Sequence, residues 1–439
     1  MYLEGKEPTF RKQPRRANPY RVLVLLVLIV AFLAILRAYA RGDIETPFMP
    51  THTPTRTTYS YVVEGNTHFM AGSLDKAIES FQKATEVDPN DPALYVELAR
   101  VQTYSSSLLT TDAERQARLT DAMTAIDKAK ELAPRDSSVL AVRAFVLNWN
   151  ANPALAGEKS EALLNEAEAE VVLALQLDGT NTLALAYYAE ILVDQLKWVQ
   201  AQQYIQAAVE RDPSLMDVHR IQAYTYETLG EYNLAIQEYK KAIEITPNLT
   251  FLYISVGKVY RHLQLYDQAL EYFAMAANLN EQLGIKDPIP YLAIANTYAR
   301  DGEFFAASRN VYKALTFNPY SPDVYGQLGL IYHKSRNYEG AIPALQCAVE
   351  GCTAEESCEV RECNPETDPM VAIEGLPLSD NTVVYYFTYG SVLSGLHRPG
   401  DDYCVTAMEV FAQIREKYAD DPTIMGIVKA GEDICISID

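Results

Sequence analysis

The chain has 439 residues, of which 49% are apolar and 22% charged, and this balance excludes a wholly disordered protein. Its net charge is −21, and residues 42–439 alone carry −27 because the first 41 residues hold eight basic and two acidic side chains. A field of this sign repels phosphate backbones, so the composition argues against nucleic acid as a partner.

The first predicted element is a membrane helix. Val22–Leu36 is an unbroken apolar run between Arg21 and Arg37. As a helix it rises about 22 Å, and snorkelling arginine stems together with the next residues extend it toward the ~30 Å hydrocarbon core. We therefore expect a basic cytoplasmic leader at 1–21 and a transmembrane signal anchor at 22–40.

A cleaved signal peptide is the alternative, because Ala38-Tyr39-Ala40 fits the small-x-small cleavage pattern. The long leader, and Arg37 inside the cleavage region, favour an uncleaved anchor. Both interpretations place the N-terminus in the cytoplasm and the following residues outside it, because the basic cluster precedes the segment. We expect a single-pass protein of the cell membrane with an extracytoplasmic body, or a secreted protein if the segment is cleaved.

A spacer is predicted at 41–57, between the membrane segment and the body. It is rich in threonine and contains Pro47, Pro50 and Pro54. Prolines at this spacing disfavour helix and keep the chain extended. The spacer would hold the body away from the bilayer.

Small residues recur at three positions down the rest of the chain. The first position is Gly65, Ala99, Ala144, Ala189, Ala223, Gly257, Ala295 and Gly329. The second is Ala77, Ala122, Ala167, Ala201, Ala235, Ala269, Ala307 and Ala341. The third, seven residues after the second, is Ala84, Ala129, Ala174, Ala208, Ala242, Ala276, Ala314 and Ala348. The period is 34 residues, with eleven extra residues in repeats two and three and four between repeats six and seven.

This period predicts two helices per repeat. Alanines seven residues apart share one face of a helix, where small side chains let neighbouring helices approach closely. Prolines end the second helix, because the residue before a proline resists helical geometry. These prolines are Pro89, Pro134, Pro213, Pro247 and Pro319.

The pattern resembles the tetratricopeptide repeat (TPR) family. Repeat five carries the full signature, with Ala223, Tyr226, Gly230, Ala235, Tyr239, Ala242 and Pro247 in its slots. The resemblance implies an all-α fold, a right-handed superhelical solenoid of stacked antiparallel helix pairs. We expect eight repeats at 58–350, a cysteine-rich acidic insert at 351–380, and a degenerate ninth repeat with a C-terminal capping helix at 381–439. A solenoid needs such a cap to cover its last apolar face.

The resemblance also implies a peptide-binding groove lined by the first helix of each repeat. The residues expected there are Arg220, Tyr224, Lys258, Arg261, His262, Asn296, Arg300, His333 and Lys334. Gathered cations predict an acidic segment or a C-terminal carboxylate as the partner. The alternative is that they pair with acidic residues of adjacent repeats. The lysine of the family's carboxylate clamp is replaced by Ile254, Leu292 and Gly326, which argues against that particular clamp.

Six cysteines lie after residue 346. Their spacing lacks the close Cys-x2-Cys pairs that a zinc site needs, so we expect no metal. An even number outside the cytoplasm predicts three disulfides. We expect Cys404 to pair with Cys435, whereas Cys347, Cys352, Cys358 and Cys363 allow three pairings, among which the sequence does not choose.

The sequence holds no motif for metal-dependent, nucleophilic or nucleotide-dependent catalysis, so we expect neither an enzyme nor a cofactor. The predicted function is a membrane-tethered extracytoplasmic scaffold that binds proteins through its concave groove. Two alternatives stay open. One is a sensor or receptor subunit that binds a small ligand, and the other is a structural subunit of a membrane assembly.

Overall fold

The computed structural model describes residues 18–40 and 56–438. The chain divides into two units, Met1–Arg56 and Thr57–Asp439. Most of the predicted leader (1–21) and of the predicted spacer (41–57) therefore lies outside the described residues.

In the described residues of the first unit, the helix α1 (Pro19–Ala40) covers the predicted membrane segment. Its side chains from Pro19 to Arg37 are exposed, as expected of a helix with no protein around it. Pro19–Ala38 is long and apolar enough to cross a membrane, and a signal sequence would have the same length and composition.

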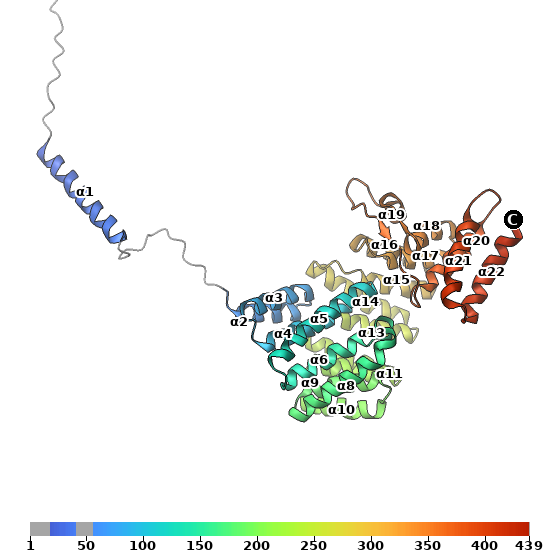
Figure 1. Cartoon of the computed structure of the whole chain (residues 1–439), viewed down its shortest axis with the longest axis horizontal. Helices are drawn as coiled ribbons and strands as arrows, with labels where there is room; N and C mark the ends of the chain where they lie inside the picture. The colour runs from blue at the N-terminus through green and yellow to red at the C-terminus, as the bar shows by residue number, and fades with distance from the viewer. Residues whose placement is uncertain (1–17, 41–55, 439) are drawn as a thin grey trace, which may run out of the picture. The chain divides into compact units, whose positions relative to one another are not determined.

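The second unit is an array of helical hairpins, which confirms the predicted all-α solenoid (Figure 1). The first helices of repeats one to eight are α2 (Thr58–Met70), α4 (Pro92–Ser106), α6 (Ser137–Asn150), α9 (Thr182–Asp194), α11 (Met216–Thr228), α13 (Thr250–His262), α15 (Ile289–Asp301) and α17 (Pro322–Lys334). The second helices are α3 (Leu74–Val87), α5 (Asp112–Leu132), α8 (Ser160–Leu177), α10 (Trp198–Arg211), α12 (Tyr232–Ile245), α14 (Tyr266–Leu283), α16 (Phe304–Phe317) and α18 (Tyr338–Val349).

The small positions of the repeat are where helices meet. Every alanine at the three positions is fully buried. At Gly257 the approach is so close that an added Cβ would stand 2.4 Å from the ring of Phe273 on the partner helix. The pattern of small residues thus fixes the spacing of each hairpin.

The eleven-residue additions change the second and third repeats in different ways. In repeat two they lengthen the link and the helix α5, which has 21 residues. In repeat three they form the short helices α7 (Pro153–Ala156) and η1 (Gly157–Lys159) between α6 and α8.

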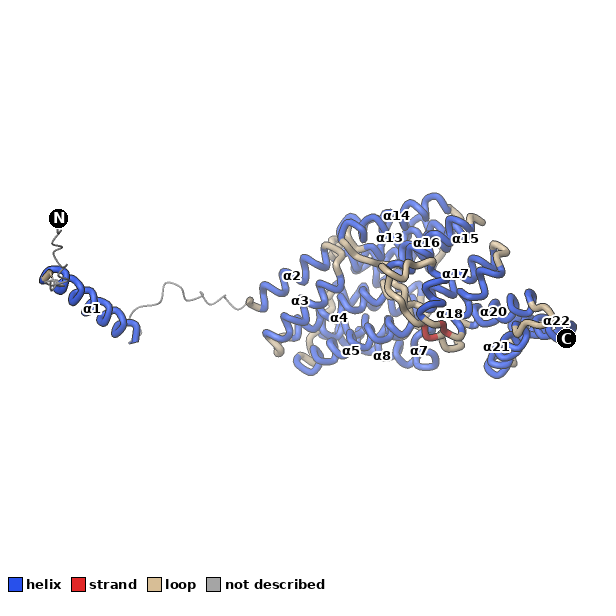
Figure 2. The backbone as a smooth tube through the Cα atoms, turned by 90° about the horizontal axis from the view of Figure 1, so that it is seen from above, coloured by secondary structure: helices blue, strands red, loops and turns tan. Residues whose placement is uncertain are grey.

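One turn of the superhelix brings the first two repeats against repeats five to nine (Figure 2). Asn248 Nδ2 donates to the Met70 carbonyl at 3.0 Å, and Asn318 Nδ2 donates to the Thr110 hydroxyl at 3.2 Å. Gly72 is needed at this seam because its φ is +77° and an added Cβ would stand 1.9 Å from the Asn248 carbonyl oxygen. We call this junction the seam.

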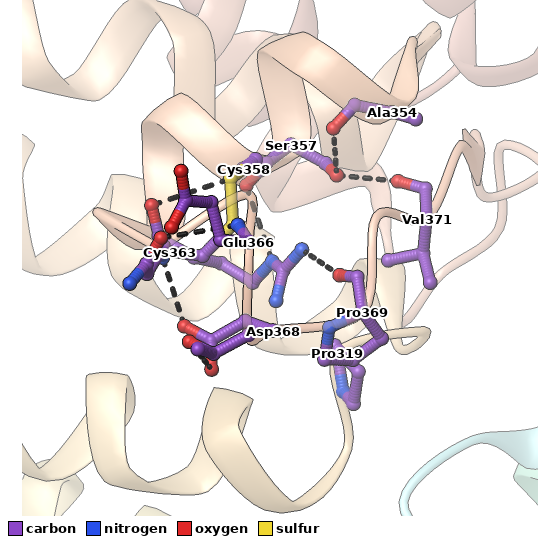
Figure 3. Close-up of a disulfide and its surroundings, with 12 residues drawn as sticks. Pro319, Ala354, Ser357, Cys358, Cys363, Glu366, Asp368, Pro369 and Val371 are labelled. Atoms are coloured by element: carbon purple, nitrogen blue, oxygen red, sulfur yellow. Dashed lines mark hydrogen bonds between the residues drawn. A yellow bond between two sulfur atoms is a disulfide. The ribbon is translucent and has the colours of Figure 1, made fainter.

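The insert after repeat eight is a small disulfide-linked subdomain that packs against α18. Strands β1 (Gly351–Cys352) and β2 (Ile373–Glu374) pair antiparallel, and α19 (Ala354–Arg361) lies between them in the chain. Disulfides join Cys347 to Cys352 and Cys358 to Cys363. Figure 3 shows the second of these, beside the contact of the Ser357 hydroxyl with the Val371 carbonyl.

The array ends with α20 (Val383–Leu396), α21 (Tyr403–Tyr418) and α22 (Pro422–Ile438). The pair α20 and α21 forms a ninth hairpin, and α22 packs against both of its helices. A disulfide between Cys404 and Cys435 links α21 to α22. The last hairpin is therefore held to its closing helix by a covalent bond as well as by apolar packing.

Candidate functional site

The nine residues expected in the groove fall into two groups, and the first group is paired inside the protein. Arg220 on α11 is only 7% exposed, and its guanidinium donates two hydrogen bonds to Glu190 on α9, at 2.8 and 2.7 Å. It also lies over the ring of Tyr104, 5.4 Å from the centroid. Arg220 therefore follows the alternative that the sequence left open, pairing with an acidic residue of the adjacent repeat.

Tyr224, the second member of this group, also binds a carboxylate of the preceding repeat. Its hydroxyl donates to Asp194 at 2.7 Å. Burial raises the pKa of Asp194 to about 6, although the hydrogen bonds from Tyr224 and Asn148 favour the charged form. Tyr224 thus contacts its own neighbour rather than an open groove.

A third buried group, absent from the sequence prediction, connects these residues to the start of the array. Asp217 on α11 is 1% exposed and accepts hydrogen bonds from Arg100 at 2.8 Å, from Tyr187 at 2.9 Å and from Tyr104. Burial alone would raise its pKa, but the charge and hydrogen bonds of Arg100 lower it to about 2. We call Asp217 and these three partners the interior hub.

The hub fills the inside of repeats two to five. Tyr104 stacks on Phe251 of α13 with ring centroids 5.3 Å apart, so α4 touches a helix of repeat six across the superhelix. Phe145 stacks in turn on Tyr187 at 4.5 Å. This part of the array is packed inside with the protein's own side chains.

The second group has a different environment. Lys258 and Arg261 lie on α13, one turn apart, and Arg300 lies on α15 in the next repeat. None of the three forms an ion pair with a residue in the described part of the chain. The one hydrogen bond among them runs from Arg261 to the Ala293 carbonyl, at 3.3 Å. The three cations are therefore not neutralised by carboxylates.

The pKa values of Lys258 and Arg261 reflect the crowding of positive charge on this surface. Surrounding protein lowers the pKa of Lys258 by desolvation, and the charges of Arg261 and Arg115 lower it further, whereas Glu227 opposes them. Desolvation and the charge of Arg300 lower the pKa of Arg261 in the same way. Lys258 nevertheless exposes its side chain to solvent. The group is an accessible concentration of positive charge, which an anion would relieve.

Arg115 is a contributor that the sequence did not predict. It lies in the first turn of α5, within the lengthened second repeat, and forms an ion pair with Asp112 at 3.0 Å. Only the closing of the superhelix brings it near Lys258, so no local pattern could have placed it there.

The remaining predicted residues extend this surface or support it. The ring of His262 accepts or donates a 2.8 Å hydrogen bond with the Tyr232 hydroxyl, and Asn296 donates to Gln327 at 3.2 Å. Burial and the neighbouring Lys334 lower the pKa of His333. Lys334 is exposed at the end of α17. We call Lys258, Arg261, Arg300 and Lys334 the basic track.

Metal binding has no support in the described residues. Within 18–40 and 56–438, no group of three or more His, Cys, Asp or Glu side chains is arranged to hold a metal ion. The cysteines of this part of the chain are all in disulfides.

Comparisons with known proteins identify the repeats. A family model described as TPR repeat matches residues 65–102, and one described as Tetratricopeptide repeat matches residues 221–249 and 322–350. The TPR repeat-containing protein YpiA of Bacillus subtilis (strain 168) is 25% identical over 140 residues, covering 32% of this chain and 33% of that protein. The BBSome complex member BBS4 of Bos taurus is 28% identical over 122 residues, covering 27% of this chain and 22% of that protein.

The matched stretches span only a third of the first relative and about a fifth of the second. Among solved structures, a thermophilic TPR protein of Thermus thermophilus is similar at 17% identity and a TM-score of 0.38, covering 46% of this chain and 98% of that one. These repeats imply protein partners in general, as the sequence predicted.

Proposed function

We propose that this chain, which is built from tetratricopeptide repeats, is a membrane-tethered scaffold that binds an acidic peptide segment of a partner protein along its basic track. The observation that carries the proposal is the set of cations Lys258, Arg261 and Arg300, none of which forms an ion pair with a residue that the structure describes. These cations lack carboxylate partners in the described part of the chain even though residues 42–439 carry a net charge of −27 and are therefore rich in carboxylates.

Charge and geometry suit an extended acidic segment. Lys258 and Arg261 on α13 are followed by Arg300 on α15 and Lys334 on α17, so the track crosses three successive repeats. Guanidinium groups bind carboxylates through two parallel hydrogen bonds, and a crowded cation gains more from an anion than an isolated one does. Like-charge crowding here would be relieved on binding.

An internal acidic segment fits better than a free C-terminus. The slots where the family's clamp places lysine hold Ile254, Leu292 and Gly326, and Ile254 and Leu292 are buried. A single terminal carboxylate would therefore lack one of its usual partners, whereas side-chain carboxylates spread along a peptide would meet the track at several points.

Location outside the cytoplasm is part of the proposal. Two observations support it: the apolar helix α1 after a basic leader, and three disulfides in the second unit. The test is protease treatment of intact cells followed by N-terminal sequencing of the protein retained in the membrane. Digestion of the body in intact cells and an N-terminus before α1 would support the proposal. A body protected until lysis would contradict it.

Binding by the track is tested by reversing two of its charges. The double variant K258E/R261E should lose capture of an immobilised, amidated acidic peptide. The matched control is K83E/R135E, which makes the same change in net charge at two exposed positions on other elements. Unchanged capture by K258E/R261E, or equal loss in the control, would contradict the role of the track.

A further inference from the structure

A cavity of about 540 Å³ opens at the seam, separate from the basic track. One wall comes from repeats one and two: residues 72–76, Ser105, residues 108–110 and Glu114. The facing wall comes from repeats six and seven: Asn280, residues 283–288 and the pair Phe317 and Asn318. Its volume lies within the range of ligand pockets, about 300–1,000 Å³.

The loops that build this cavity are departures from the 34-residue period. The link before α5 belongs to the lengthened second repeat, and residues 280–288 contain the four residues added between repeats six and seven. Regular repeats would need neither addition to stack. The two additions face each other, and a hydrogen bond between Asn318 and Thr110 joins the walls beside the cavity.

The lining offers an apolar enclosure. Its apolar members come from both walls: Leu74, Leu108, Leu109, Leu283, Ile285, Pro288 and Phe317. Such a surface suits a ligand with an aliphatic or aromatic body, because the transfer of apolar area from water favours binding.

Asp287 is a buried carboxylate in this lining. It is 6% exposed, and its two oxygens accept hydrogen bonds from the Ile289 amide at 2.9 Å and from Asn280 Nδ2 at 2.8 Å. No cation in the described part of the chain forms an ion pair with it. A buried carboxylate with neutral partners only is costly unless a positive charge is supplied, and an ammonium group in the cavity would supply it.

The other charged residues of the lining limit the ligand class. Asp75 forms an ion pair with Arg118 at 3.1 Å, and Glu114 accepts the hydrogen bonds that cap α5. Lys76 and Lys286 are exposed at the rim and form no ion pair with a described residue. They would repel a ligand that carries only positive charge, and they would attract a carboxylate.

We propose that the seam cavity binds a small zwitterion of the amino-acid class with an apolar side chain. Its ammonium group lies against Asp287, its carboxylate against Lys76 and Lys286, and its side chain among the leucines and Phe317. The ligand bridges the two walls of the seam, so binding stabilises the closed superhelix. The site is independent of the basic track, and each can fail without the other.

Binding should also depend on pH through Asp287. Burial raises the pKa of Asp287 to about 6, so this carboxylate is half protonated near that pH in the free protein and mostly protonated below it, where it loses its attraction for an ammonium group. The charged groups around it are Asp75 and Lys76 of α3, Glu114 of α5 and Lys286 of its own loop.

The test is calorimetric titration of the full-length protein in detergent with three probes: leucine, 3-methylbutylamine and 4-methylpentanoate. The last two keep the apolar body and one charge each. We expect leucine to bind at least tenfold more tightly than either analogue, and its affinity to fall as the pH drops below about 6. No heat from leucine at millimolar concentration, or equal binding of leucine and the carboxylate analogue, would overturn the proposal.

Variants separate the two charged contacts from folding. Asp287→Asn should lower the affinity for leucine at least tenfold. Asp267→Asn, at an exposed position of α14, should leave that affinity unchanged. K76Q/K286Q changes only exposed side chains, so the variant should fold normally. Its affinity for leucine should fall, whereas its affinity for 3-methylbutylamine should not. If K76Q/K286Q binds leucine as the wild type does, the assignment of the carboxylate end is wrong.

Discussion

Repeats two to five and repeats six to eight use their charged residues in opposite ways. Arg100 and Arg220 each have a buried carboxylate, Asp217 or Glu190, within hydrogen-bonding distance, and Arg220 is itself buried whereas Arg100 is half-buried. In the basic track, Lys258 and Arg300 are exposed and have no such partner among residues 18–40 and 56–438. The repeat places charges at similar slots in both regions. The difference is whether another part of the array, either the preceding repeat or a repeat one superhelical turn away, places a carboxylate beside the cation.

The comparison separates stability from binding. Removing one member of a buried ion pair lowers the free energy of unfolding strongly, because the remaining member is left as an unpaired buried charge. An exposed crowded cation costs the folded state a little and gains when an anion arrives. Substitutions in the two regions should therefore have opposite consequences for folding and for binding.

The largest effect is expected at the interior hub. Asp217→Asn removes the buried carboxylate at the centre of the hub and leaves Arg100 with only the more exposed Glu97, at 3.1 Å, so we expect the free energy of unfolding to fall by about 3–5 kcal/mol. Urea denaturation of the full-length protein in detergent measures it. The exposed Asp267→Asn should change the value by less than about 0.5 kcal/mol. A loss at Asp217 as small as that control would mean that the hub does not hold the superhelix closed.

A somewhat smaller effect is expected from pH. The pKa of Asp217 is about 2 in the folded protein and about 3.9 in an unfolded chain. Because the folded value is the lower one, the stabilisation is fully present above pH ~4 and is lost as the pH falls toward 2. The free energy difference between wild type and Asp217→Asn should shrink by about 2–3 kcal/mol across this window. A difference that stays constant down to pH ~2 would contradict the assignment.

The smallest effect, of opposite sign, is expected in the basic track. Lys258→Gln removes a cation whose pKa is lowered by desolvation and by Arg261. The free energy of unfolding should therefore increase, by less than about 1 kcal/mol, and the melting temperature should rise with it. Differential scanning fluorimetry beside Lys83→Gln measures this. A melting temperature that falls for Lys258→Gln but not for Lys83→Gln would show that Lys258 makes a stabilising contact in the free protein.

The repeat was predictable because its signal is local and repeated. Alanines at fixed spacing and prolines after the second helices are sufficient to predict helix pairs, and the structure confirms them. Even the departure at Arg143, in a slot that usually holds an aliphatic residue, has a local reason. Its guanidinium forms ion pairs with Asp127 at 2.8 Å and Glu170 at 3.0 Å, from the helices on either side.

The hub and the seam were not predictable, because they depend on the pitch of the whole superhelix. Asp217 and Arg100 are 117 residues apart in the sequence, and Asn318 and Thr110 are 208 residues apart. No window of sequence contains both partners. For the same reason the sequence grouped Arg220 with Lys258: the residue types agree, and only the long-range packing separates a buried structural pair from an exposed cation.

The most direct test of the proposed function is a charge-swap experiment. Wild type and K258E/R261E are each titrated, by fluorescence anisotropy at low salt, with an amidated peptide of alternating glutamate and alanine and with its lysine counterpart. Binding by the basic track predicts that the wild type prefers the acidic peptide by more than tenfold and that the variant reverses the preference. If both proteins bind the acidic peptide equally, the basic track is not the binding site.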